Sequence, residues 1–428
     1  MTGAGHPARP EVPFERSVSL ATARATLERS LAACGLAWRL QARGRHVTTA
    51  KCTLYDGSGT PVEAGFGKGE PDAAQAGALF EAAEHWFGRF GRGGHAGVVH
   101  RNSRRYARST RVLNGLLTHL IEQSAPADMA LRSYRRLGGR QTVLYPVGLS
   151  DPKYVDARYE GIAADDADRF DYSRIEAYCS NSGVAIGSSE VDATIHGLLE
   201  TVERDALSEF LVGAFLLRQR HRLRVVAPAS LPADLKRLKQ RVQAETGHAV
   251  MLVELANRFG IPVFCAALDR SASPIEATGY GCSLSRLHAA RRSLYELVQG
   301  WHISQRFHPA GYRRKHRQIE ERFRKHPFHL RCAQMMLGPW IREIGCDRVA
   351  YGETASVDAP EDLDAYLGAI VRLLERQGHR AYAAVLATLP GGEAIVHSLF
   401  DRQEHFFCAV EGLFVLPDMA RWPDLASA

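Results

Sequence analysis

Residues 180–206 read SNSGVAIGSSEVDATIHGLLETVERDA, and this stretch is the most informative part of the chain. Its glycine-rich start leads into a helical pattern that we expect to run from about Glu190 to Leu217. His196, Glu200 and Glu203 are spaced four and then three residues apart, which places them along one stripe of that helix. The residues between them are mostly apolar, so the helix is expected to be largely buried. A buried carboxylate needs a cation or a hydrogen-bond partner.

The same spacing occurs on two other expected helices, near 72–89 and 287–307. Their stripes are Gly77, Glu81 and Glu84 on the first helix, and Arg292, Glu296 and Gln299 on the second. A glycine-rich stretch precedes each of the three helices: GFGKG at 65–69, SNSGVAIG at 180–187 and TGYGC at 278–282. An isolated E-x-x-E is usually a solvated helix face, and GFGKG alone is usually a hairpin turn. The threefold recurrence of spacing and glycines favours one shared site instead.

These residue types suit a metal and a phosphate. Carboxylates from two helices, with Glu296 from the third, provide the oxygen ligands that Mg²⁺ prefers. Glycine lets the backbone approach a ligand closely, amides near a helix start suit phosphate, and Lys68 would add a positive charge. GFGKG is neither a Walker A loop nor a dinucleotide-binding turn. His196 is the one candidate for a proton acceptor, and it identifies no general base by itself.

Composition sets the bounds. The 428 residues are 45% hydrophobic and 24% charged, enough for one large core or two to three lobes. We find no run of 18 uncharged apolar residues and no signal-peptide pattern, so no membrane span is expected. The eight cysteines are scattered without a C-x-x-C pair, which favours reduced thiols in a cytoplasmic protein.

The chain is basic, with a formal net charge of +7. Part of this charge lies in RRKHRQIEERFRKH at 313–326, where glutamates are mixed among the arginines. That mixture is typical of a solvated helix face. No aromatic-interleaved basic motif accompanies it, so we expect no nucleic-acid partner.

Helices and strands mix without a regular βαβ alternation, which predicts an α+β fold with mixed sheets and packed helices. The segments 142–150 (TVLYPVGLS) and 405–417 (HFFCAVEGLFVLP) look like strands. We expect residues 1–15 to be a disordered lead-in and 16–428 to form one catalytic domain. Its three binding segments lie near 65–89, 178–206 and 278–300.

Three segments resemble the ATP-binding segments of the YcaO superfamily. They are GKGEPDAAQAGALFEAAEH from Gly67, the stretch at 180–206, and GYGCSLSRLHAARRSLYELVQG from Gly279. Their order matches, and the resemblance covers about residues 16–417. It implies an unusual α+β fold that binds ATP and Mg²⁺ without a P-loop, often as a homodimer.

The resemblance also implies an activity on ribosomally made precursor peptides. A Cys, Ser or Thr side chain adds to the preceding backbone carbonyl, the oxyanion takes the γ-phosphoryl group of ATP, and phosphate leaves to give a thiazoline or oxazoline. Related members form thioamides or amidines.

Site residues follow by correspondence with the family's segments. Mg²⁺ ligands would be Glu81, Glu84, Glu200 and Glu203, with Glu296 as a further candidate. Residues that touch the nucleotide or order its pocket would be Arg16, Lys68, Gly77, Glu81, Asn181, Ser182, His196, Arg204, Arg292, Glu296 and Gln299.

The sequence departs from the family pattern at four places. Gly77 stands where serine is usual, and His85 where arginine is usual. Ser182 is an extra residue in the middle loop, so either Asn181 or Ser182 could take the asparagine's role. The end FVLPDMARWPDLASA lacks the P-x-P-x-P spacing of many azoline-forming members.

Three hypotheses remain from the sequence. The first is an ATP-dependent peptide cyclodehydratase, the second a thioamide- or amidine-forming enzyme, and the third a non-catalytic scaffold. The stretch before Lys68 is too short for a leader-peptide-binding domain, so a separate partner protein is expected to recruit the substrate.

Overall fold

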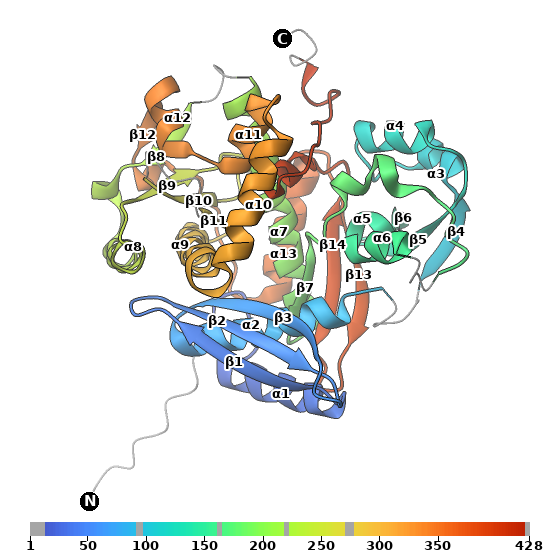
Figure 1. Cartoon of the computed structure of the whole chain (residues 1–428), viewed down its shortest axis with the longest axis horizontal. Coiled ribbons are helices and arrows are strands. Elements are labelled where there is room, and N and C mark those ends of the chain that lie inside the picture. Colours follow the sequence, from blue (N-terminus) through green and yellow to red (C-terminus); the bar gives the residue numbers. More distant parts are fainter. Residues whose placement is uncertain (1–12, 91–96, 161–164, 218–221, 270–277, 424–428) are drawn as a thin grey trace, which may run out of the picture.

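The computed structural model describes residues 13–90, 97–160, 165–217, 222–269 and 278–423. Three sheets and the helices packed on them make up the fold, so the α+β prediction is confirmed (Figure 1). The described part begins three residues before the expected domain boundary at residue 16. Pro13, Phe14 and Glu15 belong to the described structure, and the Glu15 residue is only 5% exposed. Residues 1–12 of the expected lead-in lie outside the described part.

The N-terminal sheet is an antiparallel meander with two helices on one face (Figure 1). Leu27 and Leu31 of the first helix and the alanines of the second pack against it. Its elements are α1 (Leu20–Ala33), β1 (Ala37–Arg43), β2 (Thr48–Tyr55), β3 (Pro61–Gly69) and α2 (Pro71–Phe87).

The second sheet has five strands in the order β11-β10-β9-β8-β12, and only the β8–β12 pair is parallel. Two helices share a hydrophobic core with it. These elements are β8 (Leu223–Val226), α8 (Ala233–Thr246), β9 (Val250–Glu254), β10 (Val263–Leu268), β11 (Thr278–Cys282), α9 (Arg286–His302) and β12 (Cys346–Val349).

The third sheet has six antiparallel strands, ordered β4-β5-β13-β14-β7 with β6 paired to β5. The strands are β4 (Val98–Asn102), β5 (Asp128–Arg136), β6 (Thr142–Pro146), β7 (Val184–Gly187), β13 (Ala381–Thr388) and β14 (Ala394–Phe400). The remaining helices are α3 (Ser103–Ser109), α4 (Gly115–Gln123), α5 (Val147–Ser150), α6 (Pro152–Tyr159), α10 (Pro309–Arg322), α11 (Pro327–Gln334), α12 (Leu337–Ile344) and α13 (Leu363–Arg376).

Helix α7 (Glu190–Leu211) occupies the middle of the molecule, between the second and third sheets (Figure 1). The Ser189 hydroxyl caps it by accepting the Asp192 N–H at 3.2 Å. Most of its apolar side chains are buried, and Leu198, Leu199 and Val202 are fully so. The expectation of a long buried helix is therefore confirmed, and its last turn continues as a π-helix, Val212–Leu216.

One expected strand, at 405–417, is wrong, and the expected strand at 142–150 is confirmed only as far as Pro146. Residues 406–411 form a 3₁₀-helix instead, closed by the Cys408 N–H to His405 carbonyl bond and ended by Gly412 at φ +83°. In 142–150, the strand stops at Pro146 and the short helix α5 follows. Short runs of buried apolar residues look alike in a strand and in a buried turn, so periodicity could not separate them.

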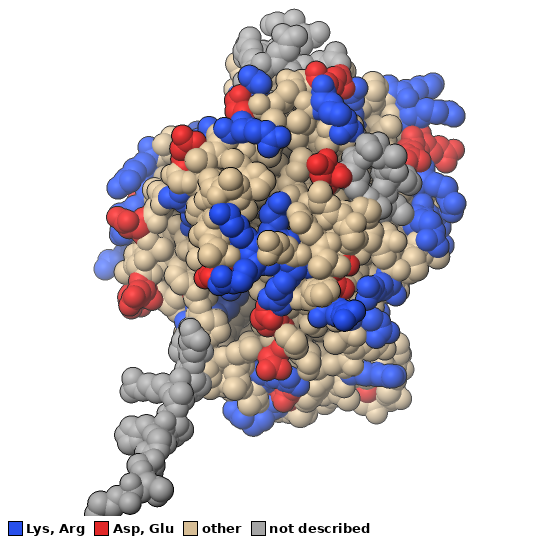
Figure 2. Space-filling model, turned by 90° about the vertical axis from the view of Figure 1, so that its left-hand side faces the viewer, with Lys and Arg blue, Asp and Glu red and all other residues tan. Residues whose placement is uncertain are grey.

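The basic residues lie on the surface as expected. Helix α10 carries the exposed arginines of 313–322, with the buried Ile319 on its inner face. On the side of the molecule shown in Figure 2, Lys and Arg side chains gather in the middle of the face, with Asp and Glu scattered around them. Within the described ranges, no helix combines the length and the apolarity needed to cross a membrane.

The buried carboxylate of Glu245 joins the N-terminal sheet to the helices packed on the second sheet. Glu245 of α8 accepts the N–H groups of Arg45 and His46 at 2.7 and 2.6 Å, in the turn before β2. His302 of α9 donates from Nε2 to the same carboxylate at 2.9 Å and accepts the Thr49 hydroxyl at Nδ1. Burial acts to raise the pKa of Glu245, but these amides and His302 lower it to about 2.

We expect Glu245→Gln to lower the free energy of unfolding by about 2 kcal/mol at pH 7, because a charge-assisted contact between two units is lost. A carboxyl group whose pKa is lowered by folding stabilises the folded state, and this stabilisation is complete at pH values above the ordinary pKa. For Glu245 the stabilisation is lost as the pH falls toward 2. The difference from the wild type should therefore shrink between about pH 4.5 and pH 2. Urea unfolding across this range measures it, with the exposed Glu321→Gln as control. A difference that does not depend on pH would contradict the assignment.

Candidate functional site

Glycines in the strands let the helices α2 and α9 lie directly on backbone. A Cβ on Gly67 of β3 would stand 1.9 Å from the Ala74 carbonyl oxygen, and one on Gly281 of β11 would stand 2.2 Å from the Ala289 carbonyl oxygen. Any larger residue would push the helix away. The interpretation of GFGKG and TGYGC as loops that approach a ligand is therefore wrong, since both lie in strands and their glycines face helices.

Phe66 lies between Gly65 and Gly67 of β3, and Tyr280 lies between Gly279 and Gly281 of β11. The backbone amide of each orients a carboxylate on the next helix. The Phe66 N–H donates to Glu81 Oε1 at 3.2 Å, and the Tyr280 N–H donates to Glu296 Oε1, also at 3.2 Å. The Ile186 N–H of β7 donates to Glu84 Oε2 at 2.9 Å, so α2 is tied to the third sheet as well. Backbone amides thus fix three of the predicted carboxylates and leave their remaining oxygen atoms for other partners.

Lys68 joins the first and third predicted segments. Its ammonium group forms an ion pair with Glu296, from β3 to α9. Both oxygens of Glu296 therefore have partners, the Tyr280 amide and Lys68. The sequence placed Lys68 and Glu296 in one site, and the structure brings them together.

The carboxylates of α7 share one cation. Arg204 lies 3.6 Å from Glu200 and 3.8 Å from Glu203, and its guanidinium also contacts the rings of Tyr280 and Phe407. These separations are longer than a bidentate pair, so Arg204 balances the two charges without occupying their oxygens.

His196 lies between two arginines. An Arg16 Nη2 is 3.3 Å from its Nδ1, and an Arg292 Nη2 is 3.4 Å from its Nε2. A neutral imidazole accepts on one nitrogen only, so one of these two contacts is not a hydrogen bond in either tautomer. Three donor groups thus face one another in a half-buried place that would suit an anion. Burial, Arg292 and Arg16 lower the pKa of His196 far below its ordinary value.

The carboxylates repel one another in a dry environment. Burial, Glu200 and Glu81 raise the pKa of Glu84 well above its ordinary value. Burial raises the pKa of Glu203 to about 7, against the opposing effect of Arg204. Burial also raises the pKa of Glu81 and of Glu200. Glu296 differs: burial acts to raise its pKa, but Lys68 and Arg204 lower it. Groups with such shifts cluster at functional sites.

One residue of the site was missed. Asp192 is fully buried on α7, accepts the Ser17 hydroxyl on Oδ2 at 2.6 Å, and has no partner on Oδ1 among the described residues. It stands four residues before His196, so it extends the stripe of His196, Glu200 and Glu203 by one turn. Continuing the helical spacing toward the N-terminus would have found it.

The two candidate residues of the middle loop, Asn181 and Ser182, differ in exposure. Asn181 is exposed, whereas Ser182 is buried and its hydroxyl has no partner within the described part of the chain. The Ser182 carbonyl accepts the Nε2–H of His397 at 3.1 Å, which fixes the loop. The unsatisfied hydroxyl favours Ser182 over Asn181 as the polar group of this loop.

The remaining predicted residues have packing positions. Gly77 faces the strand, where a Cβ would be 3.4 Å from the Gly67 Cα. His85 donates from Nδ1 to the Ala64 carbonyl at 3.1 Å and so holds α2 to β3. Gln299 is buried on α9, one turn after Glu296.

The C-terminal segment returns to α7. Arg421 binds both carboxylate oxygens of the buried Asp205 at 2.8 and 3.0 Å, and Arg258 adds a third contact at 3.1 Å. Asp205 follows Arg204 directly. The tail without P-x-P-x-P spacing is therefore anchored beside the carboxylate helix.

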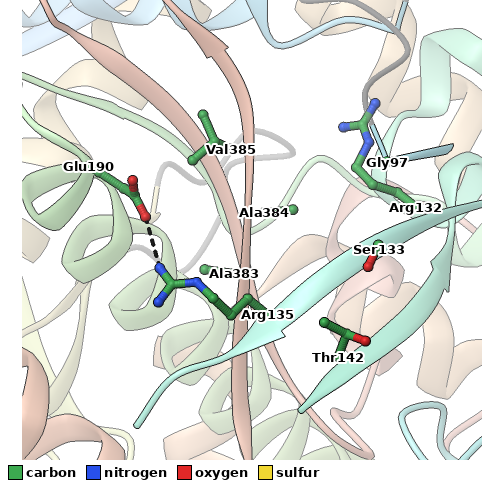
Figure 3. Close-up of a pocket in the computed structure, with 9 residues that line it drawn as sticks. All are labelled: Gly97, Arg132, Ser133, Arg135, Thr142, Glu190, Ala383, Ala384 and Val385. Carbon is green, nitrogen blue, oxygen red and sulfur yellow. Dashed lines mark hydrogen bonds and ion pairs between the residues drawn. The ribbon is translucent and has the colours of Figure 1, made fainter. Parts of the chain in front are cut away.

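Two cavities lie away from these residues. One of about 270 Å³ opens between β5 and β13, where Arg135 pairs with Glu190 at 3.1 Å (Figure 3). The other, of about 450 Å³, is lined by Cys179, Arg322 and Phe414 among others. Neither contains a predicted site residue. Over the described ranges, no three His, Cys, Asp or Glu side chains stand as a preformed metal cage.

The chain resembles known proteins in sequence and in structure. Residues 66–398 match the family model described as YcaO cyclodehydratase, ATP- and Mg²⁺-binding. No curated protein sequence matches the chain.

Three solved structures share the fold at low identity. A YcaO from Methanopyrus kandleri bound with AMPPCP and Mg²⁺ has a TM-score of 0.64 at 16% identity, covering 95% of this chain and 97% of that one. A heterocyclase in complex with substrate and cofactor also has a TM-score of 0.64, at 15% identity, covering 92% of this chain and 54% of that one. The E. coli microcin synthetase McbBCD complex with pro-MccB17 has a TM-score of 0.52 at 14% identity, covering 85% of this chain and 86% of that one.

These likenesses establish the architecture, and this chain spans about half the length of the heterocyclase chain. The family model covers more than three quarters of the residues, including the strands and helices that carry the carboxylates. The chain therefore belongs to the YcaO family of ATP- and Mg²⁺-binding proteins.

Proposed function

We propose that this protein is an enzyme that uses ATP to activate a backbone amide of a ribosomally made precursor peptide, forming a thiazoline or oxazoline from Cys, Ser or Thr. The observation that carries the proposal is the arrangement of buried and half-buried carboxylates from α2, α7 and α9 beside the Arg16–His196–Arg292 group. One half suits a divalent cation and the other an anion, as a metal-bound triphosphate requires.

The residues fit Mg²⁺ by their chemistry. Four carboxylates with raised pKa values, Glu203 buried and the other three half-buried, repel one another, and a divalent cation would relieve this repulsion. The holders would be Glu81, Glu84, Glu200 and Glu203. Bound there, Mg²⁺ would neutralise charge that develops on the phosphates. Glu296 is the weakest candidate ligand, because Lys68 and the Tyr280 amide already engage it; we assign it to orienting Lys68.

The other residues would bind and orient the phosphates. Arg16 and Arg292 present guanidinium groups to the same buried place, and Ser182 adds an unpartnered hydroxyl. Phosphoryl transfer depends mainly on positioning and charge stabilisation, which these fixed donors supply. The attacking side chain of the peptide would add to the carbonyl, and the oxygen of that carbonyl would leave as phosphate while ATP becomes ADP.

We propose that a second protein delivers the precursor peptide to this chain. The E. coli microcin synthetase structure is a McbBCD complex with pro-MccB17 bound. We extend this to the present chain by proposing a separate partner protein that binds the leader of the precursor peptide. A homodimer of this chain is part of the same proposal.

Glu203→Gln is expected to weaken Mg·ATP binding by about tenfold to a hundredfold, because one ionised oxygen ligand is lost. Isothermal titration calorimetry with ATP, in the presence and absence of Mg²⁺, measures the change. Glu190→Gln is the matched control, since it lies on the same helix and makes only an exposed pair with Arg135. Equal affinities for Glu203→Gln and Glu190→Gln would exclude the carboxylate assignment.

Ser182→Ala is expected to act with opposite signs on the free and the bound protein. The free protein should keep or gain thermal stability, because a buried unsatisfied hydroxyl is removed. The rise in melting temperature on adding Mg·ATP should shrink, because a hydrogen bond to the ligand is lost. Differential scanning fluorimetry measures both, with the exposed Asn181→Ala for comparison. A larger loss of the ATP effect in Asn181→Ala would reverse the assignment of the loop.

The mass of the peptide product distinguishes azoline formation from thioamide formation and from a scaffold that leaves the peptide unmodified. After co-expression with its precursor peptide and leader-binding partner, mass spectrometry should find the loss of one water for each modified Cys, Ser or Thr. A heavy-oxygen label in the attacked carbonyl should appear in released phosphate. Exchange of oxygen for sulfur would indicate a thioamide-forming enzyme instead. ATP binding with an unmodified peptide would favour a scaffold.

A further inference from the structure

Residues 14–17, the N-terminal strap, connect three helices by consecutive side chains. Phe14 packs its ring against His288 of α9 and Tyr366 of α13, with ring centroids 5.2 and 5.9 Å apart. Arg16 and Ser17 reach α7, at His196 and Asp192. The strap therefore spans the space between α7 and α9, where the phosphate-binding residues lie.

Glu15 anchors the strap. Its Oε1 accepts hydrogen bonds from the Ser283 hydroxyl, at 2.6 Å, and from the Tyr366 hydroxyl. Its Oε2 lies 3.6 Å from His288 Nε2 and 3.9 Å from an Arg292 Nη1. The side chain is only 2% exposed, so this carboxylate is held by an internal set of donors and not by solvent.

The backbone at Glu15 explains how neighbouring side chains reach opposite helices. Glu15 has φ +62°, in the left-handed region, inside a turn closed by the Arg16 N–H to Pro13 carbonyl bond at 3.2 Å. That conformation is unfavourable for a residue with a Cβ, so the surrounding contacts must hold it. The turn sends Glu15 toward α9 and α13 and sends Arg16 toward α7.

Two positive side chains meet near this carboxylate. Arg16 donates to the Glu15 carbonyl at 3.0 Å and contacts His196, while Arg292 contacts His196 from the other side. Two half-buried guanidinium groups on one neutral imidazole would repel each other without a nearby negative charge. Glu15 is the carboxylate that lies beside Arg292 and next to Arg16 in the chain.

We propose that Glu15 is a positioning residue of the nucleotide site: its carboxylate, fixed by Ser283 and Tyr366, holds the strap so that Arg16 stands opposite Arg292 across His196. This inference rests on the proposed function, in which Arg16 and Arg292 bind the phosphates of ATP. It adds a residue outside the three binding segments, together with the two hydroxyl groups that hold it.

The distances around Glu15 distinguish a positioning role from competition with the nucleotide for Arg292. A carboxylate that occupied the phosphate position would pair closely with Arg292. Glu15 instead keeps 3.9 Å from Arg292 and makes its short contacts with the hydroxyl groups on the far side. An anchor predicts weaker ATP binding when Glu15 is removed, whereas a competitor predicts tighter binding.

The first test reads the strap directly and needs no ATP. Trypsin cleaves after arginine, and the anchored strap should protect the bond between Arg16 and Ser17. We expect cleavage at Arg16 to be at least about tenfold faster in Glu15→Gln and in Tyr366→Phe than in the wild type, as expected when a charged or buried hydrogen bond is lost. Glu28→Gln on α1, which removes only a surface ion pair, is the matched control. Unchanged cleavage in both variants would overturn the anchor.

The second test asks whether the anchor acts through Arg16. In steady-state kinetics of ATP consumption, Glu15→Gln should raise the KM for ATP about tenfold and change kcat less. The double variant Glu15→Gln/Arg16→Ala should bind ATP no more weakly than Arg16→Ala alone, because the first change removes what the second already lacks. Multiplying effects, or tighter ATP binding in Glu15→Gln, would overturn the proposal.

Failure of the proposed function has a different signature. A wild-type protein that does not bind Mg·ATP would refute the nucleotide site, while the trypsin experiment would still decide whether Glu15 anchors the strap. If Glu15→Gln does not fold, Tyr366→Phe carries both tests, since it removes one donor to Glu15 from a helix outside the binding segments.

Discussion

The site depends on helices that lie on strand backbone. At Gly67 and Gly281 there is no room for a Cβ, so α2 and α9 come close enough for the strand amides of Phe66 and Tyr280 to reach carboxylates on the helices. The same arrangement, glycine-x-glycine on a strand with a glutamate on the next helix, occurs in both the N-terminal and the second sheet. A larger side chain in either strand would displace the helix and its carboxylate together, so packing and function share one constraint.

The helical stripes could be predicted from the sequence because their spacing is local. Glu81, Glu84, Glu200 and Glu203 each lie on the expected helix, and Lys68 meets Glu296 as the shared site required. The glycines were assigned to a ligand because sequence cannot tell which backbone a glycine faces. Glu15 was placed in a disordered lead-in because the residues that bury it, Ser283 and Tyr366, are more than 250 positions away in the chain. Contacts of that kind leave no local signal.

The charges of the site explain how the free protein holds so many half-buried ionisable groups close together. Carboxylates and cations alternate across the three helices: Lys68 with Glu296, Arg204 between Glu200 and Glu203, and Arg292 near Glu15. Among the described residues, Glu81 and Glu84 form no ion pair, and Glu200 and Glu203 share Arg204 only at 3.6 and 3.8 Å. An excess of negative charge therefore remains on one side and an excess of donors on the other, which is the polarity that a metal-bound triphosphate complements.

Helix α7 is fixed at both ends by segments from the two ends of the described chain. Ser17 of the strap binds Asp192 near its start, and Arg421 of the C-terminal segment binds Asp205 near its last turns. Glu200 and Glu203 lie between these two points. Because a buried ion pair is costly to break from one side, Arg421 restrains the end of the helix strongly. The hydrogen bond from the Ser17 hydroxyl to the buried Asp192 carboxylate adds a restraint near the start. The carboxylates of α7 thus owe their position to residues far from them in sequence, and the tail that lacks the P-x-P-x-P spacing still reaches the residue next to Arg204.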